Sequence, residues 1–355
     1  MSFNYKDIAR IILESKEPIL IITDSDQDGI ASGILMKIIL QKLNKNFEVL
    51  VRNHGKISYQ DLMKIKEKYK EYETFILLDS PYPDEALIDL AKEKKVIYID
   101  HHKREVPKDI PENLIYFDVR ALNLDIISTA GIVYRIGKEL FDDGFKRYSL
   151  IAVIGAIGDY MFEQDEMLKK DFREEYPSLY LRESFTPQLF YIFSYFLFGN
   201  PKYLVENGEK ILDNLQEFFS KKLVKGCVKG LKKFTKALNN LRLIYSSEKL
   251  EVYRSTSSSY PANLISSLKP NKIIVVVSPA YENLFEKLLA KIGIIRKYKL
   301  SIRRRVINID VGKLISEFTE RYGIQGGGHP EAAGGLIYAR DLDKLIRFIE
   351  DKLKE

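Results

Sequence analysis

Three short apolar runs in this chain each end in residues that could bind a metal ion. The runs are PILIIT (18–23), TFILL (74–78) and KVIYI (95–99). They lead, in that order, into DSDQDG (24–29), into Asp79, and into Asp100, His101 and His102. Carboxylate oxygens with one imidazole suit manganese or magnesium, whereas a structural zinc site would favour cysteine. These residue types indicate a metal site, provided that the fold brings the three segments together.

The apolar runs have the pattern of buried strands. Together with residues 47–51, they alternate with segments of helical spacing, and continuous apolar strands of this kind are typical of a parallel sheet. Ligands of open α/β sheets bind outside the carboxyl ends of the strands, so the three polar clusters should converge. A further apolar element at 149–157 leads to Asp159, and Ser128 has the sequence context of a helix N-cap.

Other interpretations exist for the acidic cluster. The aspartates at alternate positions, Asp24, Asp26 and Asp28, resemble the start of an EF-hand loop, but the twelfth position is Leu35 instead of glutamate. An exposed acidic turn remains an alternative, as does simple surface polarity for the histidine pair. Several carboxylates at converging strand ends would repel one another unless cations neutralised them, which favours the metal site.

A glycine-rich segment near the C-terminus carries the fourth histidine. It includes Gly326, Gly327, Gly328 and His329. It is neither a P-loop nor a dinucleotide fingerprint, because no Gly-Lys-Ser/Thr follows and no third spaced glycine is present. A plain tight turn is one interpretation. We favour a cradle in which backbone amides approach a phosphate group.

The chain has 355 residues, enough for two domains and a connector. We expect an α/β protein with an N-terminal parallel-sheet catalytic domain at 1–162, a helical connector at 163–244 and a smaller C-terminal α/β domain at 245–355. The C-terminal domain should have strands near 250–253, 272–277, 299–302 and 306–309, and helices near 281–291 and 341–354. The apolar run at 187–199 should form a buried helix.

The composition of the chain excludes some structural features and some classes of protein. A single cysteine excludes an internal disulfide, and no uncharged stretch reaches the ~20 residues of a membrane helix. The sequence therefore predicts a cytoplasmic protein with no membrane partner. The net charge of +6 permits a polyanionic partner, and residues 221–242 and 291–305 are basic without an acidic residue. These segments could follow a nucleic-acid backbone, or simply be solvated surface.

The motifs DSDQDG, LLDSPYPD, DHH, GDY and GGGHPEAAGG occur in the order and spacing of one known family. In this respect the chain resembles the DHH phosphoesterases with a DHH-associated C-terminal domain, along nearly its whole length. The resemblance implies two divalent ions, manganese with magnesium as the alternative. Asp24, Asp26 and Asp79 would hold one ion, and Asp28, Asp79, His101 and Asp159 would hold the other.

The same resemblance implies roles around the metals. His102 would face the substrate phosphate, Asp100 would orient the histidine pair, and residues of the second domain would bind the phosphate. These are Ser301, Arg303, Gly326, Gly327, Gly328 and His329. Many family members have histidine where Asp24 stands, whereas RecJ-type members have aspartate. This difference favours a RecJ-like protein and makes Asp24 the ligand most open to question.

The expected activity is metal-dependent hydrolysis of phosphodiester bonds, because two bound ions can activate a water and stabilise both oxygens of an in-line displacement. A RecJ-like exonuclease would release mononucleotides from single-stranded or short DNA or RNA. A nanoRNase or a cyclic-dinucleotide phosphodiesterase is the alternative within the family. A replication-helicase scaffold without turnover is the alternative of another class, and replication or repair proteins could be partners. The sequence leaves open the preference for DNA or RNA, the polarity of digestion and the oligomeric state.

Overall fold

The computed structural model describes most of the chain. The described residues are 3–52, 57–102, 106–177, 201–213, 238–255, 269–280, 297–322 and 325–354, with scattered positions at 225, 228, 232, 235–236, 262, 265–266 and 288. The chain divides into two compact units, Met1–Gly230 and Leu231–Glu355. The division of the first unit into a catalytic part and a connector remains a prediction.

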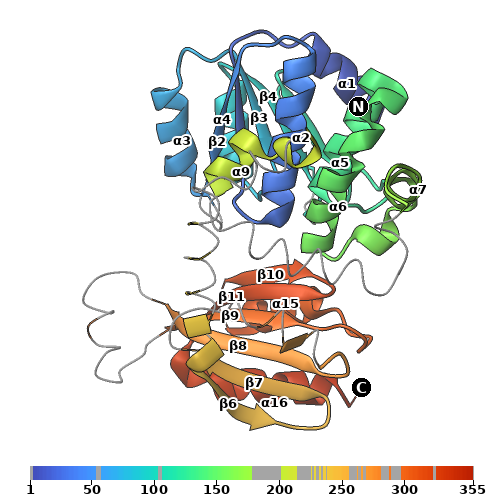
Figure 1. Ribbon diagram of the computed structural model, residues 1–355. Coiled ribbons are helices and arrows are strands. Elements are labelled where there is room, and N and C mark those ends of the chain that lie inside the picture. Colours follow the sequence, from blue (N-terminus) through green and yellow to red (C-terminus); the bar gives the residue numbers. More distant parts are fainter. Residues whose placement is uncertain are drawn as a thin grey trace. The chain divides into compact units, whose positions relative to one another are not determined.

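The first unit is built on a five-stranded parallel sheet (Figure 1), which confirms the predicted fold class. Its strands, in the order in which they lie side by side, are β2 (Phe47–Val51), β1 (Ile19–Thr23), β3 (Thr74–Leu78), β4 (Lys95–Asp100) and β5 (Leu114–Asp118). Four of them coincide with the predicted apolar runs. The edge strand β5 was not predicted, although it is apolar and follows Pro111.

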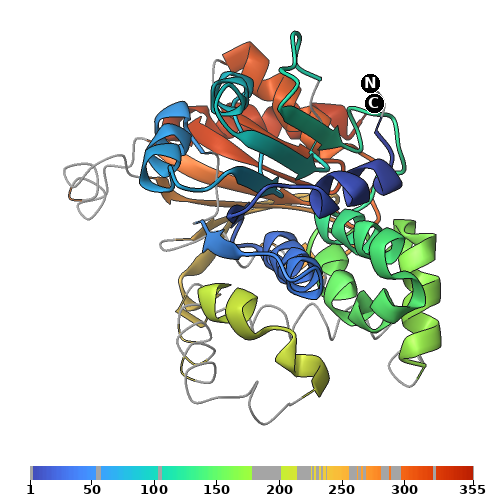
Figure 2. The same ribbon diagram turned by 90° about the horizontal axis from the view of Figure 1, so that it is seen from above.

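Helices cover both faces of this sheet because alternate strand residues point to opposite sides. Ile19 and Ile21 of β1 pack with one group of helices, namely α1 (Tyr5–Leu13), α2 (Gln27–Lys42), α5 (Thr129–Phe141) and α6 (Ser149–Gly158). Leu20 and Ile22 pack with α3 (Tyr59–Lys68) and α4 (Asp84–Ala91). Figure 2 shows the two groups of helices on either side of the sheet. The buried strands therefore expose only their ends.

Shorter elements follow α5 in the first unit. They are η1 (Asp142–Tyr148), η2 (Phe162–Gln164), α7 (Glu166–Glu175), α9 (Pro201–Asn207) and α10 (Lys210–Asp213). Those after residue 163, namely α7, α9 and α10, are helical, as predicted for this segment. The predicted buried helix at 187–199 lies outside the described residues, as does most of the basic segment at 221–242. In the described part of the chain, no helix is long and apolar enough to span a membrane.

The second unit has a six-stranded mixed sheet. Its order is β10 (Gly326–His329), β11 (Ala332–Tyr338), β9 (Lys297–Arg303), β8 (Ile273–Ala280), β7 (Leu250–Ser255) and β6 (Leu241–Ser246). Two helices, α15 (Val311–Tyr322) and α16 (Leu342–Lys352), pack their apolar residues on one face, and η3 (Ala339–Asp341) precedes α16. The strands predicted at 250–253, 272–277 and 299–302 and the helix near 341–354 are confirmed.

One prediction for the second unit is wrong. Residues 306–309 form no strand; they lead from β9 toward α15, with Ile307 and Ile309 packed against the core of this unit and Val306 67% exposed. The glycine-rich segment forms the antiparallel hairpin of β10 and β11, with Gly327 opposite Gly334, so its glycines lie in paired strands and not in a plain tight turn. The predicted helix at 281–291 lies almost entirely outside the described residues.

Candidate metal centre

The acidic cluster after β1 forms the start of helix α2. Asp26 is the N-cap, and its side chain accepts a hydrogen bond from the amide of Gly29 at 2.9 Å. A Cβ on Gly29 would lie 2.7 Å from the carbonyl oxygen of Asp24, so this tight turn requires glycine. The turn places Asp28 in the first turn of α2, where its side chain is fully buried.

The other strand ends deliver Asp79 and the histidine pair. Asp79 follows β3 and adopts a φ of 53°, a left-handed conformation that aspartate tolerates better than most residues but that still costs free energy. His101 follows β4 and is fully buried. Asp159 is the C-cap of α6, and its side chain is 20% exposed. Residues from four separate segments thus reach one edge of the sheet.

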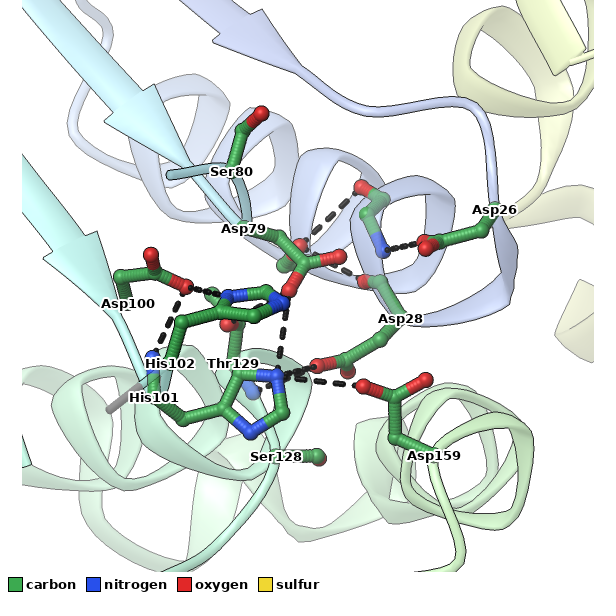
Figure 3. Close-up of polar contacts among 12 residues, drawn as sticks. Asp26, Asp28, Asp79, Ser80, Asp100, His101, His102, Ser128, Thr129 and Asp159 are labelled. Atoms are coloured by element: carbon green, nitrogen blue, oxygen red, sulfur yellow. Dashed lines mark hydrogen bonds and ion pairs between the residues drawn. The ribbon is translucent and has the colours of Figure 1, made fainter. Parts of the chain in front are cut away.

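These residues converge on the imidazole of His101 (Figure 3). Its Nε2 atom lies 3.1 Å from Oδ2 of Asp159, 3.4 Å from Oδ1 of Asp79 and 3.6 Å from Oδ2 of Asp28. One ligand atom from each of the four residues lies within 4.8 Å of the others. The predicted convergence of sequence-distant carboxylates is therefore present in the structure.

Three oxygens around one imidazole nitrogen make a donor set that suits a hard divalent cation. Oδ2 of Asp79 is buried and has no hydrogen-bond partner among the described residues, so it has a lone pair available for a metal ion. The Nδ1 atom of His101 faces Sδ of Met161 at 3.2 Å. A thioether can only accept, so Nδ1 carries a proton in this contact, and Nε2 is the ring nitrogen that faces the three carboxylates.

The pKa values of these groups reflect crowded negative charge. Burial, and then the charge of Asp159, raises the pKa of Asp28 to about 7. Burial together with Asp26 and Asp28 raises the pKa of Asp79 well above its usual range. Burial alone would lower the pKa of His101, but Asp159 and Asp28 raise it to about 9. The raised pKa values mean that this cluster of carboxylates favours a bound positive charge. A metal ion would supply such a charge in place of protons.

Asp100 contacts both residues of the histidine pair. It is fully buried; its Oδ1 accepts the amide of His101 at 2.9 Å and lies 2.6 Å from Nδ1 of His102. Tyr98 donates its hydroxyl to the other oxygen. Burial opposes ionisation of Asp100, but His102 lowers its pKa well below the ordinary value. The side chain of His102 is 28% exposed, whereas that of His101 is fully buried.

Asp24 and Asp26 are less closely associated with the cluster. Besides the group around His101, a second one unites Asp79, Asp100, His101 and His102. Neither of these two groups includes Asp24 or Asp26. Oδ1 of Asp24 accepts the amide of Ser25 at 2.7 Å, and the side chain of Asp26 accepts the amide of Gly29 at the start of α2.

The residues predicted from the second domain all lie in the second unit. Ser301 and Arg303 are on β9, next to β11, and the guanidinium of Arg303 donates to the carbonyl oxygen of Ile302 at 2.8 Å. Gly328 has a packing role, because a Cβ there would lie 2.3 Å from the carbonyl oxygen of Ala332. A Cβ on Gly312 of α15 would likewise lie 2.5 Å from the carbonyl oxygen of Gly328. Close approach of backbone segments thus explains part of the glycine pattern.

Several residues at the metal centre were not predicted. Thr129 donates its hydroxyl to Oδ1 of Asp79 at 3.0 Å, and Arg52, which follows β2, donates to the hydroxyl of Ser80. Met161 contacts His101. Ser128 was correctly predicted as a helix N-cap, and the amide of Gly131 donates to its hydroxyl at 3.1 Å. That cap was the only sequence signal pointing to this part of the site.

Known proteins resemble this chain in sequence and in fold. Residues 18–157 match the model of the DHH family, N-terminal domain, and residues 255–355 match the DHHA1 domain. Among curated proteins, the uncharacterized protein MJ0831 of Methanocaldococcus jannaschii is 29% identical over 170 residues. That alignment covers 44% of this chain and 38% of MJ0831, so it spans well under half of the relative's length.

Solved structures share the fold across both units. RecJ of Thermus thermophilus in complex with Mn²⁺ has a TM-score of 0.67 at 15% identity, covering 99% of this chain and 54% of RecJ. An exonuclease RecJ bound to manganese has a TM-score of 0.61 at 15% identity, covering 99% of this chain and 94% of that protein. The two family matches together cover more than half of the sequence, and the chain belongs to the DHH family, with a DHHA1 domain following its DHH domain.

Proposed function

We propose that this protein is a metal-dependent phosphodiesterase that hydrolyses single-stranded or short nucleic acids and releases mononucleotides, as a RecJ-like exonuclease does. One observation supports this proposed function most directly. Asp28, Asp79 and Asp159 surround Nε2 of His101 at the carboxyl ends of a parallel sheet, where such folds bind their ligands. A purely structural cluster would not need so many buried acids around one histidine.

We further propose that this site holds two divalent ions. We assign Asp28, Asp79, His101 and Asp159 to one ion and Asp24, Asp26 and Asp79 to the other, with Asp79 shared. Manganese is the proposed metal and magnesium the alternative, since structures of the Thermus RecJ were solved with each. Ions held by such ligands lower the pKa of a bound water and stabilise charge on phosphoryl oxygens.

The chain's own residues then position the substrate. His102 is partly exposed, and although burial favours its neutral form, Asp100 raises its pKa to about 9. It is therefore cationic at neutral pH and suited to attract a phosphate group. We further propose that Ser301, Arg303, Gly326, Gly327, Gly328 and His329 of the DHHA1 domain bind the nucleic-acid phosphate.

The test is hydrolysis of end-labelled single-stranded DNA and RNA, from dinucleotides to long oligomers, with manganese, magnesium or a chelator. Wild type is compared with Asp79→Asn, because asparagine also tolerates the left-handed backbone of this position. Asp171→Asn is the matched control: Asp171 is a buried aspartate on α7 that accepts the hydroxyl of Tyr134 at 2.8 Å and lies 3.3 Å from Nζ of Lys138, and asparagine keeps an acceptor for the hydroxyl.

We expect metal-dependent release of mononucleotides that Asp79→Asn reduces roughly 100-fold or more, with Asp171→Asn close to wild type. Activity confined to the shortest chains would instead indicate a nanoRNase, and turnover of cyclic dinucleotides alone would indicate that class of phosphodiesterase. Absence of hydrolysis with every substrate and metal, together with a stable complex with replication proteins, would refute the proposal and favour a scaffold.

A further inference from the structure

The first amides of helix α5 bind a carboxylate from another helix. The amide of Thr129 donates to Oδ2 of Asp28 at 2.6 Å, and the amide of Ala130 donates to Oδ1 at 2.8 Å. Asp28 lies on α2, about a hundred residues earlier in the chain. The first amides of a helix have no acceptor within it, and the positive end of the helix dipole favours negative charge. Helix α5 therefore holds both oxygens of Asp28 in a fixed orientation.

The side chain of Thr129 reaches a second carboxylate. Its hydroxyl donates to Oδ1 of Asp79 at 3.0 Å, and both residues are buried, with Thr129 fully inaccessible to solvent. Figure 3 shows Thr129 at the cluster, close to the two histidine rings, with Asp28 and Asp79 on one side of it. Water has little access to compete for this hydrogen bond. A single residue thus contacts two carboxylates that come from different elements of the fold.

This hydrogen bond distinguishes the two oxygens of Asp79. Oδ1 accepts from Thr129, whereas Oδ2 has no hydrogen-bond partner among the described residues. Rotation of the carboxylate would break the bond to the hydroxyl, so Thr129 restrains the direction in which Oδ2 points. Groups that hold a metal ligand in this way alter metal affinity although they never touch the metal.

We propose that Thr129 is a positioning residue of the metal centre, which orients Asp79 through its hydroxyl and Asp28 through its amide. This inference rests on the proposed function, because it takes Asp28 and Asp79 as metal ligands. Only the hydroxyl can be removed by substitution, so the hydroxyl's contribution is the part that mutagenesis tests. Valine has nearly the same shape as threonine and lacks the hydroxyl, whereas serine retains it.

The experiment measures Mn²⁺ binding by calorimetry to the full chain carrying Thr129→Val or Thr129→Ser, with thermal unfolding in chelator as a measure of the fold. Thr74→Val is the matched control. Thr74 is also a fully buried threonine, and its hydroxyl donates to the carbonyl oxygen of Lys16 at 2.8 Å. It begins β3, the strand whose other end leads to Asp79, so the control removes a comparable hydrogen bond away from the site.

We expect Thr129→Val to raise the Kd for Mn²⁺ by roughly 10-fold or more, Thr129→Ser to remain within a few-fold of wild type, and Thr74→Val to leave the Kd unchanged. Equal Kd values for wild type and Thr129→Val would overturn the role of Thr129 and leave the proposed function intact. An equal loss in Thr74→Val would also overturn it. A wild-type protein that binds no Mn²⁺ would overturn both. If Thr129→Val does not fold, Thr129→Ala provides the same comparison, because it removes the hydroxyl without adding a methyl group in its place.

Discussion

Oδ1 of Asp100 contacts both histidines that follow it, the backbone amide of His101 at 2.9 Å and Nδ1 of His102 at 2.6 Å. A fully buried carboxylate therefore fixes the backbone of one histidine and the ring of the other. The two imidazole rings lie with their centroids 4.7 Å apart, yet they have different surroundings. His101 faces carboxylates through Nε2, whereas His102 pairs with Asp100 through Nδ1.

We expect Asp100→Asn to lower the pKa of His102 from about 9 to near or below the ordinary 6.5, because the carboxylate that opposes the effect of burial is lost. The measurement is an NMR titration of the histidine ring protons in chelated protein. The chain has four histidines, at positions 54, 101, 102 and 329, and His102→Gln identifies the signal. A value that stays near 9 in Asp100→Asn would show that another group controls this residue.

Asp118 should make stability depend on pH. It ends β5 beside Asp100, and its Oδ1 accepts the amides of Arg120 at 2.9 Å and Ala121 at 3.1 Å. Burial, and then the charge of Asp100, raises its pKa from 3.8 to about 6. A raised carboxyl pKa means that the folded state binds the proton more tightly than the unfolded state, so stability falls as pH rises from about 4 to about 6.

Asp118→Asn removes this titration and keeps the acceptor for the two amides. We expect the variant to be more stable than wild type at pH 7 by about 2–3 kcal/mol, with the difference disappearing near pH 4. Urea unfolding of chelated protein across this pH range provides the measurement. A difference that does not change with pH would indicate that Asp118 is neutral, or ionised without penalty, in the folded protein.

Gly155 permits three helices to meet beside the metal centre. A Cβ at this position would lie 2.5 Å from Cβ of Ala130, 2.8 Å from Cβ of Ala31 and 2.9 Å from Oδ1 of Asp28. We expect Gly155→Ala to destabilise the protein by about 1–3 kcal/mol through overpacking and to weaken Mn²⁺ binding by displacing Asp28. Gly144→Ala is the control, because nothing lies within 4 Å of its added Cβ. Thermal unfolding and Mn²⁺ calorimetry of both variants test this prediction. Equal stability and equal Kd values in Gly155→Ala and Gly144→Ala would contradict it.

A partly buried ion pair attaches the turn between α9 and α10 to α2. Nζ of Lys37 lies 2.8 Å from Oε1 of Glu209, and the two side chains are 10% and 26% exposed. Removal of the carboxylate leaves a largely buried ammonium with the carbonyl oxygen of Glu206 as its remaining acceptor, whereas removal of the ammonium leaves a carboxylate that can still reach water. We therefore expect Glu209→Ala to cost about 1–3 kcal/mol and Lys37→Met to cost less. Urea unfolding of both single variants and of the double variant measures these free energies. A larger loss of stability in Lys37→Met than in Glu209→Ala would contradict the prediction.

His329 tests the proposed contribution of the DHHA1 domain. We expect His329→Gln to lower nucleic-acid hydrolysis roughly 10-fold or more and to leave the Kd for Mn²⁺ unchanged, because the proposed ligands all belong to the first unit. Steady-state kinetics and calorimetry on the same preparation separate the two effects. Full activity in this variant would remove His329 from the substrate site.

The sequence by itself determined four of the five strands of the first sheet and where the polar residues at their ends gather. Continuous apolar runs such as PILIIT and TFILL are compatible only with burial on both faces, and parallel strands present their carboxyl ends at one edge. The meeting of Asp28, Asp79 and His101 follows from that geometry. Asp159 could be placed near them only through the resemblance of the motifs, because it follows a helix, not a strand.

The tertiary structure decided the contacts that no local pattern encodes. Ser128 signals where α5 begins, but only the packing of α5 against α2 directs its first amides to Asp28 and the hydroxyl of Thr129 to Asp79. Glycine has low strand propensity, so residues 326–335 resemble a loop until pairing with β9 makes a hairpin of them. Hydrogen bonds between residues far apart in the chain depend on the assembled fold, whereas burial and helix capping depend mainly on local sequence.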